Sequence, residues 1–345
     1  MDNKKIRVAI THGDTNGIGY EVILRAFEDP MMLDICTPII YGAPKAAAFH
    51  RKAMAIETQY SIINDAADAK DGRVNLLAVC DEEPRVDFGQ PTEESDKAAK
   101  AAVQRAKEDM QKHLYDVLVM GPVVPNPNPN REDKALTIML GNQVRMGLMT
   151  TRMPSSEVAQ HLTVEKIVEK GSIFCKSLKR DFRVNNPRIA VLALNAQPGT
   201  VEEQVIAPAI EALEKQNLLA FGPYAAEDFF ANNQHEQFDG VLAMSDEQAM
   251  KPFSELSAEY GVRLKAGISA ICTTTVHGPE FELAGKGEAD ANSLRHAIYT
   301  AVDMFRHRRE YDEPLANPLP KLYHEKREDG DKARFQMPRA KDIFK

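Results

Sequence analysis

Several features that mark membrane or nucleic-acid proteins are missing from this chain. No stretch of its 345 residues approaches the roughly 18 consecutive apolar residues of a transmembrane helix, so we expect no membrane span. There is no basic excess either, because the formal net charge is −8, and this gives no support for binding nucleic acid or a membrane surface. A strand-like segment at 6–10 follows directly after two lysines, and we expect no signal peptide.

Cysteine is also scarce, with four residues spread far apart. Their spacing matches no paired zinc-binding motif. Isolated cysteines are typical of a reduced, cytoplasmic protein, and we expect each one to pack as a small apolar side chain rather than act as a nucleophile. These residues are Cys36, Cys80, Cys175 and Cys272.

What is present is the composition of a globular protein with an α/β fold. Hydrophobic residues make up 43% of the chain and charged residues 27%, and the length allows a large core, divided most simply into two domains. Strand and helix signals alternate from the start, which favours α/β architecture. We expect strands at 6–11, 38–42, 116–120, 135–140, 144–150, 189–194 and 238–244. We expect helices at 21–28, 92–113, 155–161, 164–181, 200–216, 246–259 and 291–309.

Two local patterns refine this layout. Thr200 and Glu203 have the spacing of a capping box at the start of the helix at 200–216. The stretch 122–130 contains four prolines, which exclude a helix or a central strand and indicate a stiff, extended connector.

A glycine-rich loop joins the first strand to the first helix. Gly13, Gly17 and Gly19 allow the backbone to turn tightly, and the start of the helix can offer free amides to an anion. The spacing is neither that of a Walker loop nor that of the dinucleotide fingerprint. A structural turn and an anion-binding loop both stay open.

Three segments, in the same order along the chain, resemble the 4-hydroxythreonine-4-phosphate dehydrogenase (PdxA) family. The glycine-rich loop is similar to the element Gly-Glu-Pro-Ala-Gly-Ile-Gly-Pro-Glu that opens the family. The segment 186–195 resembles the strand before the family's glycine-rich loop, and 277–287 resembles its His-Gly-Thr-Ala…Leu-Ala-Gly segment near the NAD site. The resemblance runs from about residue 6 to 310. The loop residues that match are Gly13, Gly17, Ile18, Gly19 and Glu21.

The resemblance implies a fold, a cofactor and an assembly. It implies two α/β domains of the isocitrate- or isopropylmalate-dehydrogenase type, with the active site in a cleft at a homodimer interface. On this basis we expect residues 1–125 with 267–310 to form the first domain, 126–266 to form the second and carry the dimer interface, and 311–345 to be a charged tail. The positions that match the family's NAD segment are His277, Gly278, Leu283 and Gly285, and whether NAD still binds stays open.

The chain departs from the family where the chemistry takes place. The family has a metal-binding histidine after each of three strands, and here those positions are Arg152, Gln197 and Asp246. The family's Gly-His-Thr-Glu segment, which helps to hold the substrate phosphate, is missing after Gly121. Three further polar positions of the family (Lys, Asn and Arg) fall near Ser254, Arg263 and Cys272.

These differences are hard to reconcile with a bound divalent metal. At about 4 Å and an effective dielectric constant near 20, a dication and a guanidinium repel each other by roughly 8 kcal/mol. Asp246 and a weak amide ligand do not complete a metal site. We therefore expect no divalent metal, with a salt bridge between Arg152 and Asp246 across the dimer as one structural replacement.

Three hypotheses stay open. The first is a PdxA-like protein that keeps the fold and the dimer, has lost metal-dependent dehydrogenation, and binds a ligand or a partner, including a true family enzyme in a mixed dimer. The second is an active NAD-dependent oxidoreductase with altered substrate or metal-free chemistry, in which Arg152, Arg263 and Lys265 bind an acid group. The third is a structural protein whose charged tail docks a partner.

Overall fold

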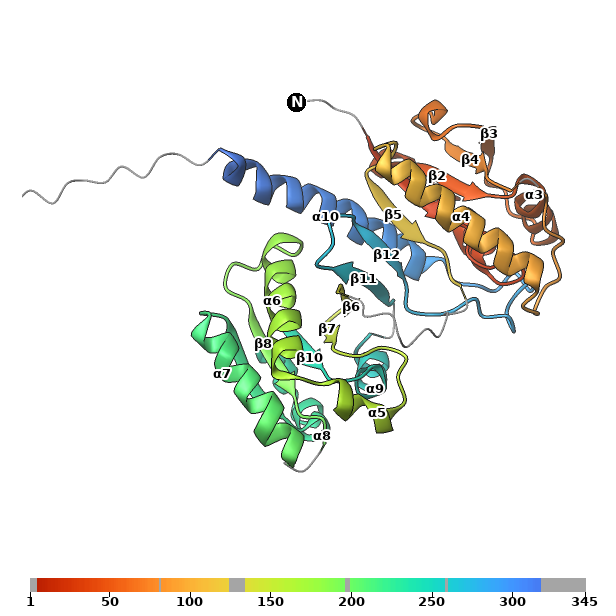
Figure 1. Ribbon diagram of the computed structural model, residues 1–345. Coiled ribbons are helices and arrows are strands. Elements are labelled where there is room, and N and C mark those ends of the chain that lie inside the picture. Colours follow the sequence, from red (N-terminus) through yellow and green to blue (C-terminus); the bar gives the residue numbers. More distant parts are fainter. Residues whose placement is uncertain (1–4, 81, 124–133, 196–198, 258–259, 318–345) are drawn as a thin grey trace, which may run out of the picture.

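The computed structural model describes residues 5–80, 82–123, 134–195, 199–257 and 260–317 (Figure 1). In these ranges the strands are β1 (Ile6–Thr11), β2 (Cys36–Gly42), β3 (Tyr60–Ile63), β4 (Val74–Ala78), β5 (Val117–Met120), β6 (Leu136–Leu140), β7 (Arg145–Leu148), β8 (Arg188–Leu192), β9 (Leu219–Tyr224), β10 (Gly240–Ala243), β11 (Val262–Ala266) and β12 (Cys272–Thr275). The helices are α1 (Gly19–Ala26), α2 (Met32–Ile35), α3 (Pro44–Ala53), α4 (Glu93–Gln111), α5 (Ser155–His161), α6 (Val164–Arg180), α7 (Ala207–Lys215), α8 (Ala226–Ala231), α9 (Asp246–Leu256) and α10 (Asn292–Ala316).

The strands form one continuous sheet in the order β3-β4-β2-β1-β5-β12-β11-β6-β7-β10-β8-β9. Neighbouring strands are parallel, except that β11 is antiparallel to both β12 and β6, and β6 is antiparallel to β7. The α/β fold expected from the sequence is confirmed. The expected domain boundary at 266–267 falls between β11 and β12, which are hydrogen-bonded to each other, and the division into domains stays a prediction.

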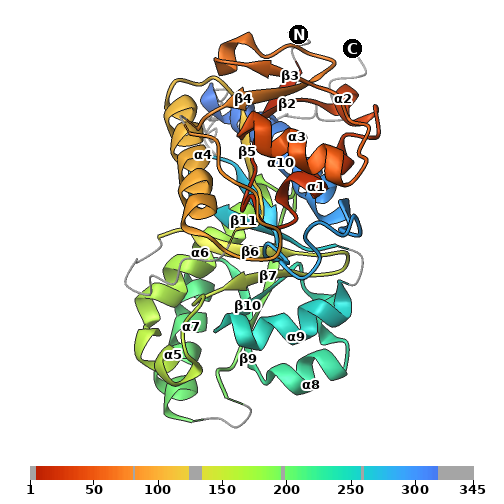
Figure 2. The ribbon, with the colours of Figure 1, turned by 90° about the vertical axis from the view of Figure 1, so that its right-hand side faces the viewer.

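Helices cover both faces of the sheet because its strands carry apolar side chains on both sides. In the half that contains β1 to β5, α4 packs on one face, and α1, α3 and α10 pack on the other (Figure 1). In the other half, α6 and α7 lie on one face and α8 and α9 on the other (Figure 2). One apolar cluster extends from Val8 in β1 to Val191 in β8, so a common core joins the two halves.

Most expected elements are present, and two expectations need correction. The capping box expected from Thr200 and Glu203 is wrong, because Glu202 Oε2, not Glu203, accepts the hydrogen bond from Gly199 N at 3.0 Å, and glycine has no side chain to complete a box. The last helix continues into the expected tail as far as Ala316. Within this extension, Asp312 Oδ1 accepts a hydrogen bond from Arg180 Nε at 2.9 Å. Residues 318–345 and most of the proline-rich connector lie outside the described residues.

The cysteines follow the expectation with one exception. Cys36, Cys175 and Cys272 are buried, whereas Cys80 is half-buried. Burial raises the pKa of the Cys175 thiol to about 11, which keeps this thiol in its unreactive neutral form. Over the described part of the chain, the helices are too short or too polar to cross a membrane.

Candidate functional site

Two of the three strand ends singled out by the sequence lie side by side. The strands β7 and β10 are parallel neighbours, so the residues that follow them meet at one edge of the sheet. Thr150 Oγ1 donates to Met244 O at 2.8 Å, and Arg152 N donates to Asp246 Oδ2 at 2.9 Å. Arg152 and Asp246 thus meet within one chain through the backbone N–H of Arg152. A salt bridge between their side chains across a dimer stays a prediction.

The third strand end, after β8, is joined to the end of β10 by Gln248. Its side chain donates to Ala193 O at 2.6 Å and accepts a hydrogen bond from Met244 N at 3.0 Å. Gln197, the residue expected at this end, lies outside the described residues. The ends of β8 and β10 are therefore bridged by an amide side chain that the sequence alone did not distinguish.

Glu202 is a second residue that sequence reasoning missed. Its Oε1 accepts hydrogen bonds from Asn195 N and Nδ2 at 2.9 and 3.1 Å. Burial alone would raise the pKa of Glu202, but these donors and Gly199 N hold the pKa below its ordinary value. The charged carboxylate of Glu202 therefore links Asn195 to Gly199. The available signal was a glutamate three residues after Gly199, the capping-box spacing displaced by one residue.

Arg263 brings a further positive charge to the strand ends. It lies on β11 with a half-buried side chain, and its Nη2 donates to Met250 Sδ at 3.6 Å. Burial lowers the pKa of Arg263, the nearby Arg152 lowers it further, and Asp246 opposes both effects. The structure thus gathers Arg152, Asp246 and Arg263 in one neighbourhood.

The other two positions expected on the substrate side lie elsewhere. Ser254 is exposed on α9, and its hydroxyl donates to Met250 O of the same helix at 2.9 Å. Cys272 is buried in the apolar cluster beneath α4, and burial raises the pKa of its thiol to about 11. Neither side chain offers a reactive group to the strand ends.

Most backbone N–H groups of the glycine-rich loop already donate hydrogen bonds within the protein. Asp14 N donates to Pro122 O at 3.0 Å, Gly17 N to Asp14 O at 3.2 Å, and Ile18 N to Pro279 O at 3.0 Å. At Gly17, a Cβ atom would lie 2.5 Å from Pro279 O, so the segment after His277 packs directly on this loop. These bonds favour the structural turn over the anion-binding loop formed by Gly13, Gly17 and Gly19.

The residues that match the NAD segment of the family lie beside that loop. His277 Nδ1 is 3.1 Å from Gly278 O and 3.8 Å from Glu280 Oε1. Leu283 packs on the main core, and a Cβ at Gly285 would lie 2.7 Å from the ring of Phe88. The structure brings these residues into one neighbourhood, and their contact with NAD stays a prediction.

Replacing Gly17 by alanine is expected to lower the free energy of unfolding by about 1–3 kcal/mol, because the new methyl group overlaps Pro279 and breaks the bond from Ile18. Gly278 provides the matched control, since a Cβ there meets no atom within 4 Å. Differential scanning calorimetry of both variants measures the effect. Equal melting temperatures would show that the loop and the 277–287 segment are not packed together.

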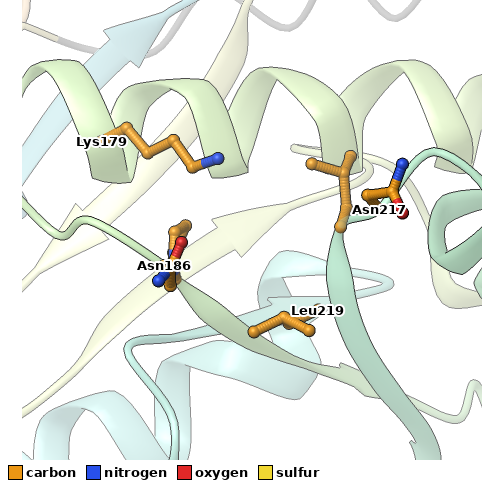
Figure 3. Close-up of a pocket in the computed structure, with 6 residues that line it drawn as sticks. Lys179, Asn186, Asn217 and Leu219 are labelled. Atoms are coloured by element: carbon orange, nitrogen blue, oxygen red, sulfur yellow. The ribbon is translucent and has the colours of Figure 1, made fainter. Parts of the chain in front are cut away.

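A small hollow between α6 and the β8–β9 edge does not belong to this site. Lys179, Asn186, Asn217 and Leu219 surround it (Figure 3). Its volume of about 20 Å³ holds about one water molecule. None of the residues expected to bind a cofactor or substrate lines it.

The side chains at the strand ends do not suit the divalent ion that the resemblance implies. Over the described residues, no three or more histidine, cysteine, aspartate or glutamate side chains come close enough together to hold a metal ion. Asp246 Oδ2 already accepts a hydrogen bond from Arg152 N, and the charges of Arg152 and Arg263 would repel a dication. The described residues at the strand ends therefore do not fit a divalent metal.

Comparison with known proteins places the chain in one family. The family model for the pyridoxal phosphate biosynthetic protein PdxA matches residues 34–126 and 129–301. The chain is 41% identical to 4-hydroxythreonine-4-phosphate dehydrogenase of Bacteroides thetaiotaomicron, over 97% of this chain and 98% of that protein. It is 28% identical to the protein of that name from Geobacter metallireducens, over 89% of this chain and 97% of the other.

Solved structures agree on the fold. The 4-hydroxythreonine-4-phosphate dehydrogenase from Burkholderia phymatum superposes with a TM-score of 0.69 at 24% identity, covering 88% of this chain and 99% of that one. The enzyme from Klebsiella pneumoniae gives a TM-score of 0.71 at 21% identity, with the same coverage. The fold, the near full-length relative and the family model agree: this chain belongs to the PdxA family of pyridoxal phosphate biosynthetic proteins.

Proposed function

We propose that this member of the PdxA family has lost metal-dependent oxidative decarboxylation and acts as a ligand-binding or partner-binding homologue. The observation that carries this proposal is the change of charge at the strand ends, where Arg152 and Arg263 lie near Asp246 in place of histidines. The family reaction needs a dication there to hold the alcohol oxygen and to stabilise the enolate that forms. Two guanidinium groups disfavour that dication, and among the described residues at these ends no group of side chains replaces its three histidine ligands.

The same proposal includes the oligomeric state of the protein. A homodimer is the state that the family resemblance implies, and a mixed dimer with a true family enzyme would let this chain act through its partner. Neither nucleic acid nor a membrane is proposed as a partner, in keeping with the net charge of −8.

The purified protein is expected to produce no NADH from NAD and 4-hydroxythreonine 4-phosphate, with Mg²⁺, Mn²⁺ or Zn²⁺ added in turn. The change in absorbance of the nicotinamide measures the reaction, and a PdxA enzyme with intact histidines serves as the positive control. NADH formation that a chelator abolishes would refute the proposal.

A second candidate is an NAD-dependent oxidoreductase with altered substrate or metal-free chemistry. It is favoured by the neighbourhood that His277, Gly278 and Gly285 form beside the glycine-rich loop. It predicts that NAD raises the melting temperature of the protein, because a ligand that binds only the folded state stabilises it. No shift at a millimolar concentration of NAD would exclude this candidate.

A further inference from the structure

The last turns of α10 lie beyond the residues that the family model matches. That match ends at residue 301, whereas α10 continues to Ala316. The helix packs on β1, β5 and β12, and its later turns contact α6, which belongs to the other half of the molecule (Figure 1). Residues 302–316 therefore extend α10 from one half of the sheet to the other.

Two contacts of this extension hold Asp181, the residue that ends α6. His307 Nδ1 donates to Asp181 O at 2.7 Å, and Arg308 Nε donates to Asp181 Oδ1 at 2.6 Å. The side chains of Arg308 and Asp181 are both buried. Separating a buried ion pair is unfavourable, because each charge is then left without its partner. These contacts fix the end of α6 to one position on α10.

Two further ion pairs surround the buried one. Arg180 Nε donates to Asp312 Oδ1 and Oδ2 at 2.9 and 3.1 Å, and Arg183 pairs with Glu310. Partly exposed pairs of this kind contribute little to stability one by one. Together with the buried pair, however, they spread the contact over residues 307–312, which is more than one helical turn. A contact of this length opposes both sliding and rotation of α6 against α10.

The extension also holds the connection between β11 and β12. Arg308 Nη1 donates to Ser269 O at 2.9 Å and to Ile268 O at 3.4 Å. A Cβ atom at Gly267 would lie 3.0 Å from Ile173 of α6. The connection in the middle of the sheet is therefore bonded to α10 and packed against α6.

Motion between two halves of a protein needs hinge residues in the connections and small sliding of packed helices. The contacts at 307–312 oppose the sliding, and the bonds from Arg308 restrain the connection between β11 and β12. Both restraints come from the part of α10 that follows residue 301.

We propose that residues 302–316 of α10 form a clamp on the end of α6 that holds the two halves of the molecule in one relative orientation. The ends of β7 and β10 lie in one half, and the segment 277–287 packs on the glycine-rich loop in the other. The clamp therefore presets the separation between these two parts of the candidate site. This inference goes beyond the proposed function and does not depend on it.

Pulsed electron–electron double resonance of the full chain tests the clamp. Spin labels at Lys107→Cys on α4 and Glu214→Cys on α7 place one probe at an exposed position in each half, with Cys80 replaced by serine. We expect a single, narrow distribution of distances between the labels. A broad distribution, or two separate distances, would overturn the proposal before any contact is changed.

The clamp variant combines Asp181→Asn, Arg308→Met and Asp312→Asn, which removes the charges and keeps the apolar stem at 308. We expect its distance distribution to be at least about twofold broader, because the packed helices can then slide. Asp303→Asn is the matched control, since it removes an exposed acid that pairs with Arg306 on the same helix. A clamp variant as narrow as its parent would show that the common core fixes the orientation without the clamp.

A milder variant, Arg180→Gln with Arg183→Gln, covers the case in which the clamp variant does not fold. It leaves the buried pair in place and removes only the partly exposed partners of α10. A smaller broadening is expected, and an unchanged width beside an unfolded clamp variant would count against the proposal. Formation of NADH does not enter these measurements, so failure of the clamp and failure of the proposed function are distinguishable.

Discussion

Replacing Arg308 by alanine is expected to lower the free energy of unfolding by about 3–5 kcal/mol, because it leaves a buried carboxylate without its counter-charge. The side chains of Arg308 and Asp181 are 7% and 3% exposed, and Arg308 Nε donates to Asp181 Oδ1 at 2.6 Å. Ser177 Oγ donates to Asp181 Oδ2 at 2.6 Å, and Arg308 Nη1 donates to Ser269 O at 2.9 Å. Asp181 ends α6 and Arg308 lies on α10, so the pair joins the two halves of the molecule (Figure 1).

Urea denaturation followed by circular dichroism measures this effect, and two variants show its origin. Arg309→Ala removes the exposed neighbouring charge and is expected to change the unfolding free energy by no more than about 0.5 kcal/mol. The double variant Asp181→Asn with Arg308→Met removes both charges and is expected to recover part of the loss. A double variant as unstable as Arg308→Ala would show that packing, rather than the unpaired charge, causes the effect.

The sequence predicted the fold well because its elements are locally encoded. The strand at 6–11 and the helix at 155–161 match β1 and α5 residue for residue. Thr92, where the expected helix at 92–113 begins, is the N-cap of α4 and forms a capping box with Ser95. The end of α10 was misjudged because charged residues near Pro314 suggest a tail, whereas the ion pair between Arg180 and Asp312 lies across a sequence separation that no local pattern reveals.

The sequence identified which positions form the candidate site, but it did not predict which other residues those side chains contact. The alignment with the family singled out Arg152 and Asp246, yet their bond within one chain depends on β7 and β10 being neighbours in the sheet. The fit of Pro279 against Gly17 is equally non-local. A resemblance identifies which side chains have changed, whereas the pairing of distant strands decides what the new side chains contact.

Acidification from about pH 8 to about pH 5 is expected to lower the free energy of unfolding by about 4 kcal/mol through His12 and His50 together. Both rings are fully buried, and burial lowers the pKa of each from 6.5 to about 4. His12 stacks on Tyr20 with ring centroids 5.1 Å apart, and His50 lies 5.3 Å from the same ring. The nearby His50 lowers the pKa of His12 further.

The sign of this effect follows from which state binds the protons. Between about pH 6.5 and about pH 4 the unfolded chain protonates these histidines and the folded chain does not, so stability falls as the pH falls, by about 2 kcal/mol per ring at pH 5. The buried carboxyls of Asp14 and Glu21 have raised pKa values and act in the opposite sense. The decisive comparison is therefore between variants.

Urea denaturation at a series of pH values measures the slope of stability against pH, which is more informative than stability itself because replacing a buried ring destabilises the protein at every pH. His50→Gln is expected to reduce the slope by up to one proton per unfolding event, or about 1.4 kcal/mol per pH unit. His161→Gln, at an exposed position on α5, is expected to leave the slope unchanged. An unchanged slope in His50→Gln would mean that His50 is protonated equally in the folded and unfolded states, which contradicts a neutral imidazole buried beneath the glycine-rich loop.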